Sequence, residues 1–320
     1  MNLKYLSASL LTLACTASAG STERKLAKAV KSSKSTLSPT SSSPTPAPTE
    51  SPVVTPFPVN PFSAMGLTHN AIRGWIFQME EDCLQAVENW TDRAKLDQAI
   101  ATTETLLKMI NTHMAQEDGK FFDAFDNTFA CVAYKEKYRE EHDHDEAEQV
   151  VLTNFTNRLK DPNLTLSQAH EVCAETFTFA SEHEAHLKHE EKVLSPLTKN
   201  FPAGSGPAIV HHVIGVNFDE THDFFFETAL DQLVKREPLS VVGSYVAAVK
   251  RILTPEQYAL VLPGIIKACG SMWPMVHERL IGEGGDYTAA DEAKLPAGIF
   301  DPINCASTMS PTKSPVKAPV

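Results

Sequence analysis

Histidines interrupt the apolar faces of four segments whose hydrophobic residues recur at helical spacing. The segments cover about residues 67–91, 94–117, 136–160 and 166–193. At about 100° per residue, the apolar side chains of each segment fall on one stripe, as in a packed helix. His69, His113 and His186 lie inside these stripes. Because a buried imidazole needs a partner, the pattern predicts helices whose polar groups meet in a common centre.

Glutamate stands four residues after two of these histidines, which gives the pairs His113/Glu117 and His186/Glu190. Positions i and i+4 share one helix face and lie about 5–6 Å apart. Each pair can therefore present an imidazole and a carboxylate to one point. Both groups are ligands of transition metals, and carboxylates can bridge two cations inside a helical bundle. The spacing predicts a His/Glu metal site.

The third helix offers two histidines, and its apolar residues favour the second of them. On a regular helix His144 shares the face of Val151 and Phe155, whereas His142 does not. A ligand near the start of a helix need not follow that phase, so both histidines stay candidates. Glu148, four residues after His144, is an additional candidate ligand.

The chain resembles the haemerythrin-like (HHE cation-binding) family over about residues 66–200. The resembling motifs are Thr68-His69-Asn70, His113-Met114-Ala115-Gln116-Glu117, Glu141-His142-Asp143-His144 and His186-Leu187-Lys188-His189-Glu190. The resemblance implies an all-α fold with an antiparallel four-helix bundle that holds two iron ions. Two glutamates and an oxo or hydroxo group would bridge the irons. The implied metal ligands are His69, His113, Glu117, His142, His144, His186 and Glu190, with Glu148 as an extra candidate.

The candidate ligand positions of this chain differ from those of the oxygen-carrying haemerythrins, because more of them are carboxylates. Those carriers share a third-helix His-x-x-x-His and a late His-x-x-x-x-Asp, whereas here the positions read His144-x-x-x-Glu148 and His186-x-x-x-Glu190. Carboxylate ligands favour ferric iron, which argues against reversible oxygen carriage. Three residues that flank the fourth-helix pair could hydrogen-bond the metal ligands without binding metal themselves: His183, His189 and Glu191.

Three functional hypotheses follow from these residues. The first is a metal-binding protein whose di-iron centre binds or senses iron, or a small ligand such as dioxygen, peroxide or an anion, without a catalytic cycle. The second is a di-iron oxidase or peroxidase-like oxidoreductase at the same site. The third is a structural helical bundle that holds zinc or no metal. No GxSxG, P-loop, GxGxxG or HExxH motif occurs, so hydrolase, nucleotide-binding and zinc-protease functions have no supporting residues.

The charge and hydropathy of the chain exclude two classes of partner. The formal net charge is −12 and no basic stripe occurs, which argues against nucleic acid. Beyond the N-terminus, no run of about eighteen uninterrupted apolar residues occurs, so we expect no membrane span.

The remaining segments suggest a secretory protein with several parts. Lys4, an apolar run and Ala17-Ser18-Ala19 form a signal-peptide pattern, and Ser/Thr/Pro-rich stretches cannot bury a core. The expected division is a signal peptide at 1–19, a disordered linker at 20–62, the bundle at 63–203, an appended helical subdomain at 204–300 and a disordered tail at 301–320. Within the subdomain, helices are expected over about 208–235, 239–252 and 255–281. We expect secretion or a lumenal location; the basic segment 21–40 leaves organelle targeting through a bipartite leader open.

Short motifs and cysteines are compatible with that route. Glycosylation sequons begin at Asn89, Asn154 and Asn163. Five cysteines remain after the predicted cleavage, without a CxxC pattern, so they do not form the metal site. An odd number leaves at least one free thiol or an intermolecular bond. Their pairing and the oligomeric state are not readable from the sequence.

Overall fold

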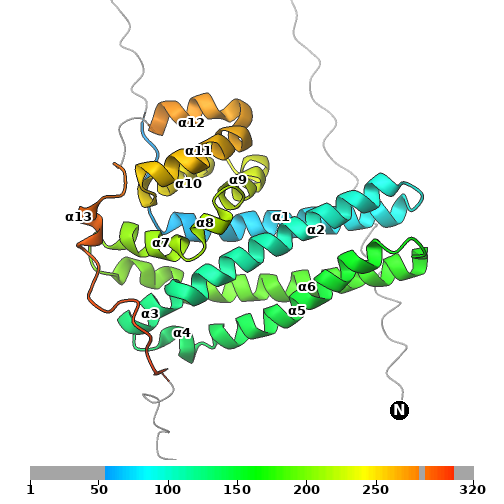
Figure 1. Ribbon diagram of the computed structural model, residues 1–320, viewed down its shortest axis with the longest axis horizontal. Helices are drawn as coiled ribbons and strands as arrows, with labels where there is room; N and C mark the ends of the chain where they lie inside the picture. The colour runs from blue at the N-terminus through cyan, green and yellow to red at the C-terminus, as the bar shows by residue number, and fades with distance from the viewer. Residues whose placement is uncertain (1–54, 281–284, 306–320) are drawn as a thin grey trace, which may run out of the picture. The chain divides into compact units, whose positions relative to one another are not determined.

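A computed structural model describes residues 55–280 and 285–305, apart from the side chains of residues 144–148 and 151. Within these ranges the fold is all-α, as predicted, and contains no strand (Figure 1). The longest helices are α1 (Ser63–Glu88), α2 (Arg93–Gln116), α5 (Tyr138–Leu159) and α6 (Leu166–Val193). The C-terminal helices are α7 (Gly206–Gly215), α8 (Phe218–Thr221), α9 (Phe225–Arg236), α10 (Leu239–Ile252), α11 (Pro255–Cys269), α12 (Trp273–Leu280) and α13 (Ala289–Glu292).

The helices α1, α2, α5 and α6 lie side by side, and the site is built between them (Figure 1). Helix α1 packs on α2 and α6, and α5 packs on the same two helices. Local signals define their ends: the Asp92 side chain accepts a hydrogen bond from the Ala94 N–H at the start of α2, and Thr165 and Gln168 form a capping box at the start of α6. The apolar stripes predicted for these helices are buried, from Ile72 on α1 to Phe179 on α6.

The α-helical part of the second helix ends at Gln116, as the sequence predicted, and the chain continues directly into a π-helical turn. Glu117–Phe121 form this turn, in which the Phe122 N–H donates to the Glu117 carbonyl five residues back. The chain then runs on as α3 (Phe122–Thr128) and α4 (Val132–Lys135). A π-turn adds a residue to a helix and is often found at functional sites. Here it begins at a predicted metal ligand.

The C-terminal helices pack onto the long ones and share a core with them. Helix α9 contacts α1 and α2, and α10 contacts α1. Gly74 on α1 permits this approach, because a Cβ there would lie 2.8 Å from the Gln232 Cβ on α9. The predicted helix over 208–235 is instead three helices, with breaks at Val216-Asn217 and again at residues 222–224. Asn217 lies at the first break. That side chain accepts a hydrogen bond from Gln116 and donates one to the Thr112 carbonyl, both on α2.

Both ends of the described chain are attached to the helices, although their composition predicts a linker and a tail. Phe57 is fully buried, and its ring lies against Gly243 on α10, where a Cβ would be 2.2 Å from the Phe57 Cζ. The Arg279 side chain stacks on the same ring and donates to the Thr55 carbonyl. At the other end Cys305 is buried in a disulfide. Residues 55–62 and 301–305 therefore belong to the packed structure, while the predicted signal peptide and the rest of both tails lie outside the described residues.

Two disulfides join distant parts of the chain. Cys83 on α1 pairs with Cys173 on α6, and Cys131 pairs with Cys305. Cys269 is buried and free, which agrees with the odd cysteine number.

One helical segment among the described residues, Pro255–Leu280, is long and apolar enough to cross a membrane by length and composition alone. This is weak evidence, since core helices of soluble proteins pass the same test. The helix is also interrupted at Gly270, whose φ of +50° separates α11 from α12.

Candidate metal centre

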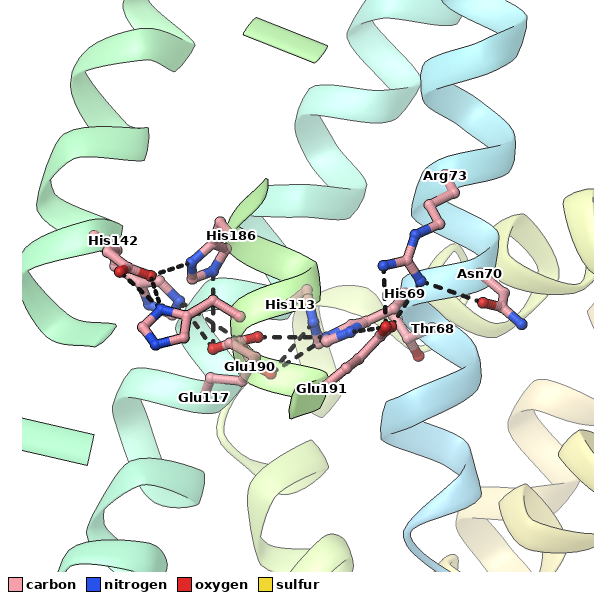
Figure 2. Close-up of polar contacts among 12 residues, drawn as sticks. Thr68, His69, Asn70, Arg73, His113, Glu117, His142, His186, Glu190 and Glu191 are labelled. Carbon is pink, nitrogen blue, oxygen red and sulfur yellow. Dashed lines mark hydrogen bonds and ion pairs between the residues drawn. The ribbon is translucent and has the colours of Figure 1, made fainter. Parts of the chain in front are cut away.

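Six of the predicted ligands converge between the four long helices. His69 comes from α1, His113 from the last turn of α2, Glu117 from the π-turn, His142 from α5, and His186 and Glu190 from α6. Each residue is at most 7% exposed. Figure 2 shows the two carboxylates lying between histidines contributed by different helices. The six residues are called the His/Glu centre below.

The two glutamates connect two pairs of histidines. On one side, the Nε2 of His113 lies 3.3 Å from Glu117 Oε1, and the Nε2 of His69 lies 3.9 Å from the same oxygen and 3.5 Å from Glu190 Oε2. On the other side, the Nε2 of His142 lies 3.6 Å from Glu117 Oε2 and 3.8 Å from Glu190 Oε1, and the Nε2 of His186 lies 3.8 Å from Glu190 Oε1. Each carboxylate therefore gives one oxygen to each pair.

These separations, 3.3–3.9 Å, are longer than most hydrogen bonds and slightly longer than those between ligands of one ion, so a bound ion would draw the ligands together. Two ligands held ~2.1 Å from one ion at a right or tetrahedral angle are ~3.0–3.4 Å apart, whereas a hydrogen bond is mostly shorter than ~3.2 Å. Potential ligand atoms fall into two groups, each within 4.8 Å: His69, His113, Glu117 and Glu190, and His142, His186 and Glu190.

Several of these buried atoms have no hydrogen-bond partner within the described structure. Both oxygens of Glu190 and both ring nitrogens of His113 are in this state. Leaving a buried carboxylate without a donor costs free energy. A bound cation would remove that cost, so the residues present fit a metal site.

Carboxylates outside the centre orient three of the four histidines. The Nδ1 of His69 lies 3.1 Å from Glu191, that of His142 lies 3.2 Å from Asp118, and that of His186 lies 3.0 Å from Glu141. For His69 and His186 the carboxylate is hydrogen-bonded to Nδ1, which fixes the proton on that nitrogen and leaves the Nε2 lone pair for a metal.

Arginines hold two of these outer carboxylates in place. Arg73 contacts Glu191 through both terminal nitrogens, at 2.6 and 3.2 Å, and its Nε contacts Glu184 at 2.7 Å (Figure 2). Arg139 lies 3.9 Å from Asp118. The charged groups around the centre therefore form a supporting layer that keeps the ligands in position.

The electrostatics of the centre without metal ions show how strongly its charges interact. Burial lowers the pKa of His113 to about 3. Burial also opposes charge on His69, but Glu117, Glu191 and Glu190 outweigh it and raise the pKa of His69 to about 10. Burial and then the charge of Glu117 raise the pKa of Glu190 well above its usual value. The metal-free centre therefore retains protons, and cation binding would release them.

His142 occupies the position for which the sequence favoured His144. Its ring is 2% exposed and faces both glutamates. The apolar-face argument missed this because the inward stripe of α5 also contains polar residues: His142, Gln149 and Thr156 are buried alongside Tyr138 and Leu152. The side chains of His144 and Glu148 lie outside the described residues.

Of the flanking residues named from the sequence, all three lie near the centre. Glu191 contacts His69, and His189 contacts Glu141 through Nδ1 at 3.0 Å. His183 is buried, with its ring centroid 5.8 Å from that of His186. The sequence did not single out Asp118 or Glu141, and their only signal is their place next to the ligands Glu117 and His142 in the chain.

A cavity of about 490 Å³ reaches the centre from the surface. Its inner end is formed by His69, Glu117 and Glu190, and its wall includes residues before α1 and residues of α10. A small molecule could therefore approach the ligands from this side.

The chain was compared with models of protein families, with curated proteins and with solved structures, and none of the three comparisons gives a match.

Proposed function

We propose that this protein binds two iron ions at the His/Glu centre, within an antiparallel four-helix bundle of the haemerythrin-like kind. The observation that carries the proposal is the arrangement of Glu117 and Glu190, each of which presents one oxygen to each of two histidine pairs. A carboxylate that faces two sets of nitrogen ligands is suited to bridging two cations.

One ion would be held by His69 and His113 and the other by His142 and His186, with both glutamates shared. The remaining coordination positions would be open to a small ligand such as dioxygen, peroxide or an anion. His183 is a further nitrogen donor beside the second pair.

The donor set supports iron and is also compatible with zinc. Imidazole and carboxylate together suit iron, and imidazole suits zinc as well. The bridging carboxylates favour the ferric state, which supports binding or sensing of iron or dioxygen over reversible oxygen carriage. If the centre holds zinc in a structural role, the iron proposal is wrong.

The cavity supports a second candidate function, a di-iron oxidase or peroxidase-like enzyme. A centre that only stores or senses ions needs no passage of about 490 Å³ that ends on its ligands. In an enzyme the ions would supply oxidising chemistry, while the chain's own residues would exclude bulk water and orient the substrate.

We further propose that the protein follows the secretory route. Two disulfides support an oxidising compartment. The three sequon asparagines, Asn89, Asn154 and Asn163, are all exposed, as glycosylation requires.

Metal content and optical spectra of the full chain, purified under air, test the proposal. We expect two iron ions per chain and charge-transfer absorption from a bridged ferric pair. His113→Ala and His186→Ala each remove a ligand from a different ion, so each should lose at least one ion per chain. His277→Ala is the matched control, since His277 is exposed on α12, and it should retain both. Stoichiometric zinc without ferric absorption, or equal metal content in all four proteins, would overturn the proposal.

Turnover separates the two candidate functions. Consumption of peroxide or oxidation of ferrous iron by the loaded protein, absent in His113→Ala, would favour the enzyme. A loaded protein without turnover would favour binding or sensing.

A further inference from the structure

The cavity beside the His/Glu centre has a wall suited to an organic ligand. Its buried end contains the apolar side chains of Met65, Phe121 and Leu194 together with the ligands of the centre. Its outer part is exposed and carries the polar side chains of Asn60, Ser195 and Ser240. Ligand pockets of proteins are typically ~300–1,000 Å³ and mostly apolar, with a few polar groups that fix orientation. This cavity, at about 490 Å³, falls within that range.

The wall is firmly supported, so the cavity is a permanent part of the fold. Residues before α1 form one side of it, and Phe57 anchors them by packing against Gly243 on α10. Phe62, which lines the cavity, stacks on Phe201 with ring centroids 5.5 Å apart. A preformed cavity avoids the cost of ordering its wall when a ligand binds.

The charges that line the cavity determine which charged group a ligand can place at its inner end. Among the described residues no lysine or arginine lines it, and the charged residues in its lining are His69, Glu117, Glu190 and Glu191. Without metal ions, Glu117 and Glu191 more than offset the charge of the His69 that lies beside them, so the lining does not attract an anion. Two bound cations of charge at least +2 would exceed the charge of the two bridging glutamates, and Glu191 is already paired with Arg73. The inner end would then attract an anionic oxygen.

We propose that this cavity binds a small monocarboxylic acid with an apolar body, with its carboxylate directed at the metal ions. The choice of carboxylate rests on the proposed function, whereas the apolar body rests on the cavity wall alone. Each added methylene should strengthen binding about fourfold, as expected for burial of an apolar chain.

Gly66 provides a variant that fills the cavity with little risk to the fold. It lines the cavity from α1, and a Cβ added there meets no atom within 4 Å. Glycine is also unfavourable inside a helix, so Gly66→Leu should not destabilise α1. Gly215 on α7 likewise has open space around an added Cβ and does not line the cavity. Gly215→Leu is therefore the matched control.

The probes are octanoate, decanoate and 1-decanol, titrated by calorimetry into the full chain with and without iron. We expect decanoate to bind the iron-loaded protein more tightly than octanoate, to shift its optical spectrum, and to bind the metal-free protein at least tenfold more weakly. Decanol should bind both forms. Gly66→Leu should weaken binding of both ten-carbon probes at least tenfold, and Gly215→Leu should leave it unchanged.

The possible outcomes distinguish the metal site, the apolar cavity and the carboxylate contact. If the chain holds no metal but decanol binds and Gly66→Leu abolishes that binding, the proposed function fails and the apolar cavity stands. If the iron-loaded protein binds neither ten-carbon probe, or Gly66→Leu binds them as the wild type does, the cavity assignment is overturned. Equal affinity of decanoate for the loaded and metal-free forms would overturn the carboxylate assignment.

Discussion

The Nδ1 of His69 lies 3.1 Å from Glu191 Oε1, so the residue directly after Glu190 in sequence orients a candidate ligand on a different helix. Because an outer carboxylate fixes the orientation of a metal-bound histidine, Glu191→Gln should lower metal affinity about 10–100-fold. Competition with a chromophoric chelator measures this. Glu182→Gln, at an exposed position of the same helix, is the control. An unchanged affinity in Glu191→Gln would show that Arg73 and Glu191 serve stability alone.

Glu190→Leu should have opposite effects on the metal-free and metal-loaded protein. Without metal, the buried Glu190 carboxyl has no hydrogen-bond donor, and replacing it with an apolar side chain should raise the free energy of unfolding by ~1–3 kcal/mol. The variant should also lose the stabilisation that iron gives the wild type. Denaturant unfolding with and without a chelator measures both effects. If the metal-free variant is less stable than the metal-free wild type, the unpaired Glu190 carboxyl does not destabilise the fold and the prediction is wrong.

The disulfide between Cys83 and Cys173 closes a long loop, with a sequence separation of 90. Loop-closure entropy then predicts that the double variant Cys83→Ala/Cys173→Ala loses roughly 4–5 kcal/mol of stability. Urea unfolding of the oxidised wild type and the variant provides the comparison. Since the disulfide joins the ends of α1 and α6 away from the centre, metal content of the folded variant should not change.

Asp291 should make stability depend on pH through its pairing with Arg251. The guanidinium lies 2.6 Å from Asp291 Oδ1 and holds the pKa of that carboxyl below its usual value of 3.8. A lowered folded-state pKa means that the ionised group stabilises the fold above about pH 4, and that this contribution is lost as the pH falls below 4.

Asp291→Asn should therefore cost about 2 kcal/mol at pH 7, with a difference from the wild type that shrinks as the medium is acidified. Asp97→Asn, which breaks an exposed pair with Arg93, should cost less than about 1 kcal/mol. Thermal unfolding between neutral and acidic pH measures both. A constant difference across that range would rule out titration of Asp291 as the cause.

Local periodicity predicted the long helices and five of the six converging residues, and it kept His142 only as the less favoured of two candidates. Helix α10 at Leu239–Ile252 and α6 at Leu166–Val193 match the predicted ranges, since proline, threonine and a capping box mark their ends. His113/Glu117 and His186/Glu190 share a helix face by spacing alone. The packing of different helices brings these pairs together with His69 and His142. The sequence indicated this packing only by placing polar residues at positions expected to be buried.

The features that were not predicted depend on contacts between residues far apart in the chain. The orientation of His142 follows from an inward stripe that includes Gln149 and Thr156, which do not look apolar. Asn217 breaks the predicted long helix because its side chain bonds to α2. Phe57 packs against α10 only because residue 243 is glycine. The composition of residues 20–62 predicted a linker, because composition alone does not show that Phe57 has a matching surface on α10.

The π-turn at Glu117–Phe121 ties the metal ligands to the aromatic residues that follow them. One extra residue rotates everything after it by about 100° around the helix axis. The chain can thereby direct Glu117 toward the histidines and still bury Phe122 and Phe125 on α3. A shortened turn would force a choice between these two orientations, so the length of this single turn sets the angular register between the His/Glu centre and the hydrophobic support beneath it.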